Sequence, residues 1–208
     1  PFITNHNALD RDLYLRIAPE LYLKRLLVGG FERVFEINRS FRNEGLSTKH
    51  NPEFTMLEYY EAYTSLDRTI SFTEDMIKKA AEEVNKSLQL QWGEDSIDLS
   101  SFRKANLSDL VLEENSELTE KSLQEMGGKN LLELFEETVE AKLIQPTFVI
   151  GYPVEVSPLS RSFDIDDNLV ERFELFVAGR EIANGFSELN DPAEQSVRFK
   201  KQVELNDE

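Results

Sequence analysis

An arginine, a carboxylate, an aromatic ring and a phenol gather around one predicted hairpin. Arg42 ends an alternating strand-like run, and the next run places four side chains on one face by its period of two: Phe54, Met56, Glu58 and Tyr60. A guanidinium is suited to bidentate hydrogen bonding with a phosphate or a carboxylate. The pattern indicates a stacking platform beside a cation site. The alternative is a half-buried hairpin with an incidental ion pair.

Two carboxylates flank a second predicted hairpin, whose turn is Ala178-Gly179. A two-residue loop pairs Phe176 with Glu181 and leaves Glu174 diagonally opposite on the same face. Diagonal neighbours lie about 7–8 Å apart, so the two glutamates can share a Mg²⁺ that also bridges substrate phosphates. The alternative is two solvated glutamates on an edge hairpin.

A third group, Asn184, Phe186 and Glu188, also alternates along the chain. The loop that pairs Phe176 with Glu181 places Asn184 on the opposite face of a regular hairpin. A β-bulge near residues 183–185, where Gly185 permits one, would return this group to the face of Glu174. Without the bulge the two groups cannot line one pocket.

Helices and strands that position these groups follow from the apolar periodicity. The first block predicts a helix over 18–27, ended by Gly29-Gly30, and an antiparallel hairpin of strands 34–42 and 54–60 joined by a polar loop from Asn43 to Lys49. Residues 67–145 read as an acidic helical insertion, with helices over 71–89 and 130–142. Strand 147–150 is short, apolar and central, strands 172–176 and 180–186 form the second hairpin, and a last helix starts at Pro192. The fold class is α+β: an antiparallel sheet flanked by helices.

Composition excludes several classes of protein. The chain has 208 residues, a formal net charge of −17 and no cysteine, which excludes disulfides, thiolate metal sites and a cysteine nucleophile. Such acidity argues against this chain alone clamping nucleic acid. The sequence contains no glycine-rich phosphate loop, no serine beside a histidine, no signal peptide and no apolar run of membrane-spanning length. A cytoplasmic protein of one domain is expected, and the absence of an initiator Met suggests a piece of a longer protein.

Together these segments resemble a known family. Phe41-Arg42-Asn43-Glu44-Gly45 followed by His50-Asn51-Pro52-Glu53-Phe54-Thr55-Met56-Leu57-Glu58 resembles motif 2 of the class II aminoacyl-tRNA synthetases. The details are similar to lysyl-tRNA synthetases of the bacterial type, as are Tyr152-Pro153-Val154-Glu155-Val156-Ser157-Pro158-Leu159 and the stretch from Gly179 to Asp191. The resemblance covers most of the chain and is least distinctive in the middle block.

The resemblance implies ATP-dependent, Mg²⁺-assisted activation of lysine and its transfer to tRNA(Lys) by a homodimeric enzyme. Arg42 would hold the α-phosphate and the lysine carboxylate. ATP would also meet Glu44 at the adenine edge, Phe54 under the ring and His50 at the terminal phosphates, with Mg²⁺ on Glu174 and Glu181. The resemblance assigns lysine to Glu20 for its α-ammonium, to Asn184 for its carboxylate, to Phe186 for its stem, and to Glu58, Tyr60 and Glu188 for its far ammonium.

Electrostatics favours the same substrate independently, because a buried ammonium without a counter-charge is costly and Glu58 and Glu188 supply carboxylates. By resemblance, motif 1 would precede Pro1, and motif 3 and the anticodon-binding domain are absent from these 208 residues, so the isolated chain should be impaired. Two alternatives remain open: a paralogue that transfers lysine to a protein, and a non-catalytic module of the same fold.

Overall fold

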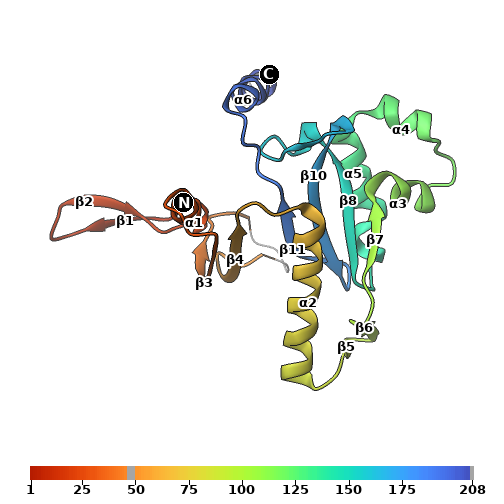
Figure 1. Ribbon diagram of the computed structural model, residues 1–208, viewed down its shortest axis with the longest axis horizontal. Coiled ribbons are helices and arrows are strands. Elements are labelled where there is room, and N and C mark those ends of the chain that lie inside the picture. The colour runs from red at the N-terminus through yellow and green to blue at the C-terminus, as the bar shows by residue number, and fades with distance from the viewer. Residues whose placement is uncertain (46–49, 207–208) are drawn as a thin grey trace. The chain divides into compact units, whose positions relative to one another are not determined.

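A computed structural model describes residues 1–45 and 50–206, which divide into two compact units, Pro1–Thr64 and Ser65–Glu208 (Figure 1). Each unit is described by itself. The predicted polar loop from Asn43 to Lys49 is described as far as Gly45, and residues 46–49 lie outside the described residues. Asp207 and Glu208 of the predicted last helix also lie outside them.

The first unit is built around a two-stranded antiparallel ribbon. Its elements are β1 (Ile3–His6), β2 (Arg11–Tyr14), α1 (Glu20–Val28), β3 (Arg33–Phe41) and β4 (Glu53–Glu61). Strands β3 and β4 pair from Arg33 opposite Glu61 to Phe41 opposite Glu53, which confirms the predicted hairpin. Helix α1 packs on both strands and buries Leu23. Pro19 is its N-cap.

The two faces of this ribbon differ in an unexpected way. Phe35 and Ile37, on one face of β3, are 70% and 63% exposed, whereas Ser40 on the other face is buried and Glu36 is half-buried. Helix α1 covers the face of Glu36, since Lys24 of the helix lies over the ring of Tyr60, which shares that face. The polar face of the hairpin is therefore the inner one within this unit.

The second unit is a sheet covered by helices on both faces. Its elements are α2 (Leu66–Asn85), β5 (Gln89–Trp92), β6 (Asp95–Asp98), β7 (Arg103–Asn106), α3 (Leu107–Glu114), α4 (Glu120–Met126), α5 (Gly128–Thr138), η1 (Glu140–Lys142), β8 (Thr147–Pro153), η2 (Val154–Val156), β9 (Ser162–Phe163), β10 (Asp166–Val177), β11 (Arg180–Phe186) and α6 (Pro192–Asn206). The strand order is β11-β10-β8-β7, with β9 beside β10. Strand β8 is central and largely buried, as predicted.

Opposite faces of this sheet carry two separate clusters of apolar side chains. Phe148, Phe173 and Leu175 pack against α2, and the rings of Phe148 and Phe173 meet edge to face at 5.2 Å. The other face packs Tyr152 and Phe176 against residues of α3 and α5. Figure 1 shows these two helices beside strands β7 and β8. Because side chains alternate along a strand, β8 and β10 each supply residues to both clusters.

The middle block contains more than the predicted helices. Helices α2, α3, α4 and α5 lie within it, but so do the β5–β6 hairpin and β7, which pairs parallel with β8 inside the main sheet. The α+β class with its antiparallel strands and flanking helices is confirmed, and β7 adds one parallel pairing that the sequence did not predict. A four-residue strand such as Arg103–Asn106 gives too little periodicity to be recognised, and its pairing depends on β8, about 40 residues further on.

The second predicted hairpin is confirmed together with its bulge. Phe176 lies opposite Glu181 as expected, and Ala178 and Gly179 take the positive φ angles of +53° and +64° that a tight two-residue turn requires. The register then shifts by one residue at Ile182, slightly before the predicted position. Glu174 consequently lies directly opposite Asn184.

Gly185 leaves room for the ring of Phe173 beneath the same hairpin. A Cβ added at Gly185 would lie 2.6 Å from Phe173 Cε1, and Phe173 is 1% exposed in the sheet core. We therefore expect Gly185→Ala to lower the free energy of unfolding by about 1–3 kcal/mol, because the ring must leave its rotamer. Urea denaturation measures this, and Gly45→Ala, with open space around its Cβ, is the control. Equal stability of the two variants would contradict the packing argument.

Candidate active site

The four residues assigned to ATP line one cavity in the first unit. Its volume is about 240 Å³, and its lining comprises Arg42, Glu44, Gly45, His50, Asn51, Pro52 and Phe54. Arg42 follows the last residue of β3, and Phe54 is the second residue of β4, so the hairpin register brings a guanidinium and a ring to the same end of the ribbon. A cation, a carboxylate, an imidazole and a ring together suit a nucleotide better than an apolar ligand.

Arg42 is held in place by the backbone on both sides. Its amide donates to the carbonyl of Pro52 at 2.9 Å, and its Nε donates to the carbonyl of Ile17 at 3.3 Å. Its guanidinium carbon lies 5.2 Å from the ring centroid of Phe54, a cation–π distance. Because Nε donates to the carbonyl of Ile17, the two terminal nitrogens are the pair that can form a bidentate interaction with an anion.

The opposite end of the same ribbon face is acidic. Tyr60 donates its hydroxyl hydrogen to Glu58 Oε1 at 2.7 Å. Lys24 donates to Glu20 Oε1 at 2.6 Å, and its ammonium lies 5.7 Å from the ring centroid of Tyr60. Lys24 thus links Glu20 to the ring of Tyr60, and Tyr60 donates in turn to Glu58, so these three residues gather near the ammonium of the chain's own Lys24. The contacts with a bound lysine that the resemblance implied, Glu20 for its α-ammonium and Glu58 and Tyr60 for its far ammonium, stay predictions.

Glu36 lies directly opposite Glu58 in the register but is already neutralised. Arg16 donates to its Oε1 at 2.5 Å, and Asn38 donates to the same oxygen at 2.9 Å. The hydrogen bond from Arg16, followed by that from Asn38, holds the pKa of Glu36 below its ordinary value. Of these two facing carboxylates, Glu58 is therefore the one suited to a ligand cation.

In the second unit the bulge collects the predicted polar groups on one sheet face. Glu174, Glu181, Asn184 and Phe186 share that face, because Phe176 pairs with Glu181, Glu174 with Asn184 and Arg172 with Phe186. The register conflict raised by the sequence is thereby resolved. Glu174 is nearly buried, with 13% of its side chain exposed.

Two residues that the sequence did not single out hold Glu174. Arg172 forms an ion pair with Glu174 Oε1, and the hydroxyl of Tyr152 donates to Oε2 at 2.9 Å. Burial and then the nearby Glu174 carboxylate raise the pKa of Tyr152 above its ordinary value, so the hydroxyl remains a donor. Burial, followed by the carboxylates of Glu140 and Glu174, raises the pKa of Glu136 on α5.

The donor set on this face fits Mg²⁺ bound with substrate phosphates. Magnesium in such sites takes one or two carboxylates, and phosphate and water oxygens complete its shell. Glu174 and Glu181 supply two carboxylates on one face, and each oxygen of Glu174 keeps a lone pair beside the hydrogen bond it accepts. Among residues 1–45 and 50–206 no group of three or more histidine, aspartate or glutamate side chains is placed to hold a metal ion.

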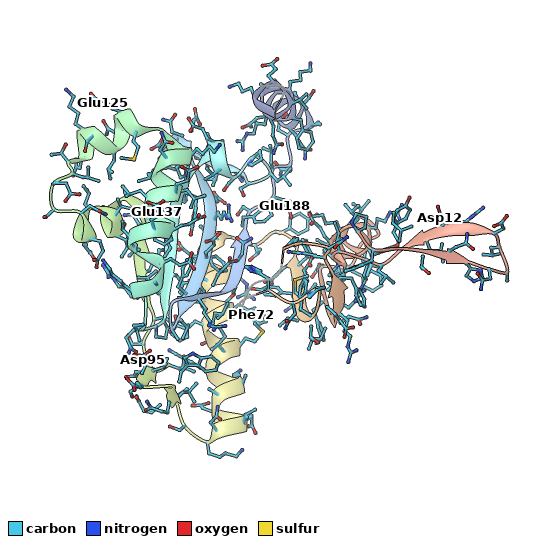
Figure 2. The ribbon with its side chains drawn as sticks, turned by 180° about the vertical axis from the view of Figure 1, so that it is seen from behind. Asp12, Phe72, Asp95, Glu125, Glu137 and Glu188 are labelled. Atoms are coloured by element: carbon cyan, nitrogen blue, oxygen red, sulfur yellow. The ribbon has the colours of Figure 1, made fainter. Side chains whose placement is uncertain are left out.

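Glu188 follows the end of β11, where Figure 2 labels it. It bridges Ser160 through the backbone in an antiparallel pair. Arg198 of α6 donates to the carbonyl of Ser160 at 2.7 Å and to Ser162 Oγ at 2.9 Å, which ties down the segment that Glu188 pairs with. Glu188 belongs to the second unit and Glu58 to the first, so the prediction that both surround one ammonium stays a prediction.

A signal for two of the missed residues was present in the sequence. Arg172 precedes Glu174 by two residues, so period two places both on one strand face, and Lys24 follows Glu20 by four, the spacing of helix neighbours. Tyr152 gave no local signal, because its bond to Glu174 crosses 22 residues of chain.

Comparison with known proteins identifies the family of the chain. The family described as tRNA synthetases class II (D, K and N) matches residues 1–208, so the chain belongs to that family. It is 51% identical to proteins named lysine–tRNA ligase from Xanthomonas oryzae pv. oryzae and Xylella fastidiosa, with all of this chain and 45% of each relative covered. The identity to the one from Bordetella bronchiseptica is also 51%, with 46% of the relative covered. The chain thus spans about half the length of these relatives.

In the part of the chain that the structure describes, no helix combines the length and apolar character needed to cross a bilayer.

Proposed function

We propose that the full-length protein carrying this chain is a lysine–tRNA ligase. It activates lysine with ATP to lysyl-adenylate and pyrophosphate, and then transfers the lysyl group to tRNA(Lys). The observation that carries the proposal lies in the first unit, where a cavity suited to a nucleotide is lined by Arg42 and Phe54, and the half-buried carboxylate of Glu58 lies further along the same face of the β3–β4 hairpin. Relatives named lysine–tRNA ligase support it.

Activation needs positioning and charge stabilisation rather than a covalent enzyme intermediate. An oxygen of the ionised lysine carboxylate attacks the α-phosphorus of ATP, the bond to pyrophosphate breaks, and no proton has to move. Arg42 would grip the α-phosphate and the attacking carboxylate, so that it stabilises charge as it spreads in the transition state. Bound Mg²⁺, on Glu174 and Glu181, would neutralise phosphate charge.

The remaining ATP contacts follow the cavity lining. Phe54 would stack on the adenine, Glu44 would accept from the adenine edge, and His50 would lie near the terminal phosphates. In this arrangement the ring of Phe54 would contact both the guanidinium of Arg42 and the adenine base.

Lysine would bind with its α-ammonium and carboxylate at one set of residues and its side-chain ammonium at another. Glu20 would take the α-ammonium and Asn184 the carboxylate, while Phe186 packs on the methylene stem. Glu58, Tyr60 and Glu188 would receive the far ammonium. A shorter or uncharged amino acid, such as aspartate or asparagine, would leave these carboxylates unpaired, so discrimination against it should be strong.

We further propose that the full-length protein is a cytoplasmic homodimer. Since the chain spans 45% of its relatives' length, the isolated 208 residues should bind lysine and ATP weakly or not at all. Isothermal titration of the isolated chain checks this, and tight binding of both ligands would contradict it.

The test of the function is pyrophosphate exchange by the full-length protein with single amino acids. We expect exchange with lysine and none with aspartate or asparagine, followed by lysylation of tRNA(Lys). Exchange with lysine but transfer to a protein in place of tRNA would identify the paralogue, and absence of exchange would identify a non-catalytic module.

A further inference from the structure

Arg172 is the most highly connected side chain of the described sheet face. Its Nε donates to Asn184 Oδ1 at 3.1 Å, and a terminal nitrogen forms the ion pair with Glu174. The other terminal nitrogen donates to Ser157 Oγ at 2.6 Å and more weakly to the carbonyl of Val156 at 3.4 Å. Every nitrogen of the guanidinium is therefore engaged.

The guanidinium of Arg172 also packs on the ring of a buried tyrosine, Tyr152. Its guanidinium carbon lies 4.8 Å from the ring centroid of Tyr152, and Tyr152 is fully buried. The hydroxyl of that same tyrosine donates to the second oxygen of Glu174. Arg172 and Tyr152 thus form a rigid pair that leaves the Glu174 carboxylate one orientation.

Contact with Arg172 also decides which way the Asn184 amide points. A guanidinium has donors and no acceptor, so it can meet only the oxygen of the amide. The NH₂ group of Asn184 must then point to the other side, where it can donate. An amide donor held in this way is suited to a carboxylate ligand, which accepts only.

Exposure argues that this cluster is more than a buried structural ion pair. Arg172 and Glu174 expose 18% and 13% of their side chains, so a ligand can still reach Glu174. The positive charge of Arg172 also offsets repulsion among the carboxylates near Glu174, which include Glu136 and, by its effect on Tyr152, Glu181.

We propose that Arg172 is a positioning residue that orients the metal-binding carboxylate of Glu174 and the lysine-binding amide of Asn184 at the same time, with Tyr152 fixing the second oxygen of Glu174. The proposal rests on the proposed function. It predicts that the two residues have separable effects, because Arg172 contacts both ligand groups and Tyr152 donates to Glu174 alone.

The experiment compares Arg172→Lys and Tyr152→Phe in the full-length protein. Arg172→Lys keeps the charge, but an ammonium lacks the planar set of donors with which the guanidinium binds Glu174 and Asn184 together. We therefore expect the Mg²⁺ requirement and the KM for lysine each to rise roughly 10–100-fold. Tyr152→Phe keeps the ring under Arg172 and should raise the Mg²⁺ requirement roughly 10-fold, with the KM for lysine unchanged. Both variants should keep kcat near wild type when lysine and Mg²⁺ saturate.

A binding readout makes the test independent of turnover. Titration of Mn²⁺ followed by electron paramagnetic resonance, with a non-hydrolysable ATP analogue present, should show a loss of metal affinity of roughly 10–100-fold in Arg172→Lys and roughly 10-fold in Tyr152→Phe. Arg161→Lys is the matched control, since Arg161 pairs with Asp164 on an exposed surface and should change nothing.

The outcomes separate the two proposals. A wild-type protein that fails to activate lysine overturns the proposed function. If the wild type is active but Arg172→Lys keeps its Mn²⁺ affinity and its KM for lysine, the positioning role is overturned alone. Should Arg172→Lys fail to fold, Tyr152→Phe decides, and an unchanged Mn²⁺ affinity in that variant overturns the proposal.

Discussion

Replacing Arg42 with lysine should reduce the rate constant for adenylate formation by about 10²–10³-fold in the full-length protein. Arg42 is anchored through Nε and lies over Phe54, so its terminal nitrogens are set to meet an anion in one plane. Lysine retains the charge but presents a single point of contact, and loss of one such transition-state contact costs rate on this scale. Single-turnover pyrophosphate release with lysine and ATP measures the step.

A matched control is available three residues earlier, within strand β3. Arg39 pairs with Glu53 at 2.7 Å and exposes 67% of its side chain, so Arg39→Lys should leave the rate within about twofold. If Arg42→Lys also remained within threefold of wild type, Arg42 would not stabilise the transition state.

Replacing Glu58 with glutamine should lower kcat/KM for lysine by about 10²–10³-fold, which corresponds to roughly 3–4 kcal/mol. Glu58 is half-buried and accepts from Tyr60, and Glu36 opposite it is occupied by Arg16. A ligand ammonium would then meet a neutral amide, and removal of one partner of a desolvated charge pair is costly. Exchange kinetics with lysine at saturating ATP measure the effect, with the KM for ATP expected to stay unchanged.

Two further variants sharpen this result. Glu53→Gln changes a carboxylate that is 51% exposed on the same strand and should have no effect on lysine. Glu188→Gln should resemble Glu58→Gln, because both carboxylates are proposed to surround the same ammonium. Retained selectivity for lysine in Glu188→Gln would remove Glu188 from the specificity site, and a normal KM for lysine in Glu58→Gln would do the same for Glu58.

Local periodicity was sufficient for most of the fold. The β3–β4 hairpin, the β10–β11 hairpin with its Ala178-Gly179 turn, and the buried strand β8 follow from alternation and turn residues, which act over a few positions. The short strand β7 escaped because its stability comes from pairing with β8, a contact that no local pattern encodes.

In the candidate site too, local patterns predicted some features and long-range contacts determined the others. Residue types and their resemblance to a family placed Arg42, Glu44, His50 and Phe54 at a nucleotide, and the structure places them around one cavity. The sequence also showed that Glu174 and Asn184 share a face only if a bulge intervenes. It could not locate the bulge at Ile182, because strand register depends on what each side chain meets across the sheet.

By itself, then, the sequence determined which side chains are available and which lie on a common face, since both follow from chain spacing. Only the tertiary structure decided which of them touch: Arg172 with Glu174 and Asn184, Tyr152 with Glu174, and Arg16 with Glu36. Tyr152 and Arg16 reach their partners across 22 and 20 residues of chain. Such contacts form when packing of whole elements brings distant segments together, and the orientation of the acidic groups depends on them.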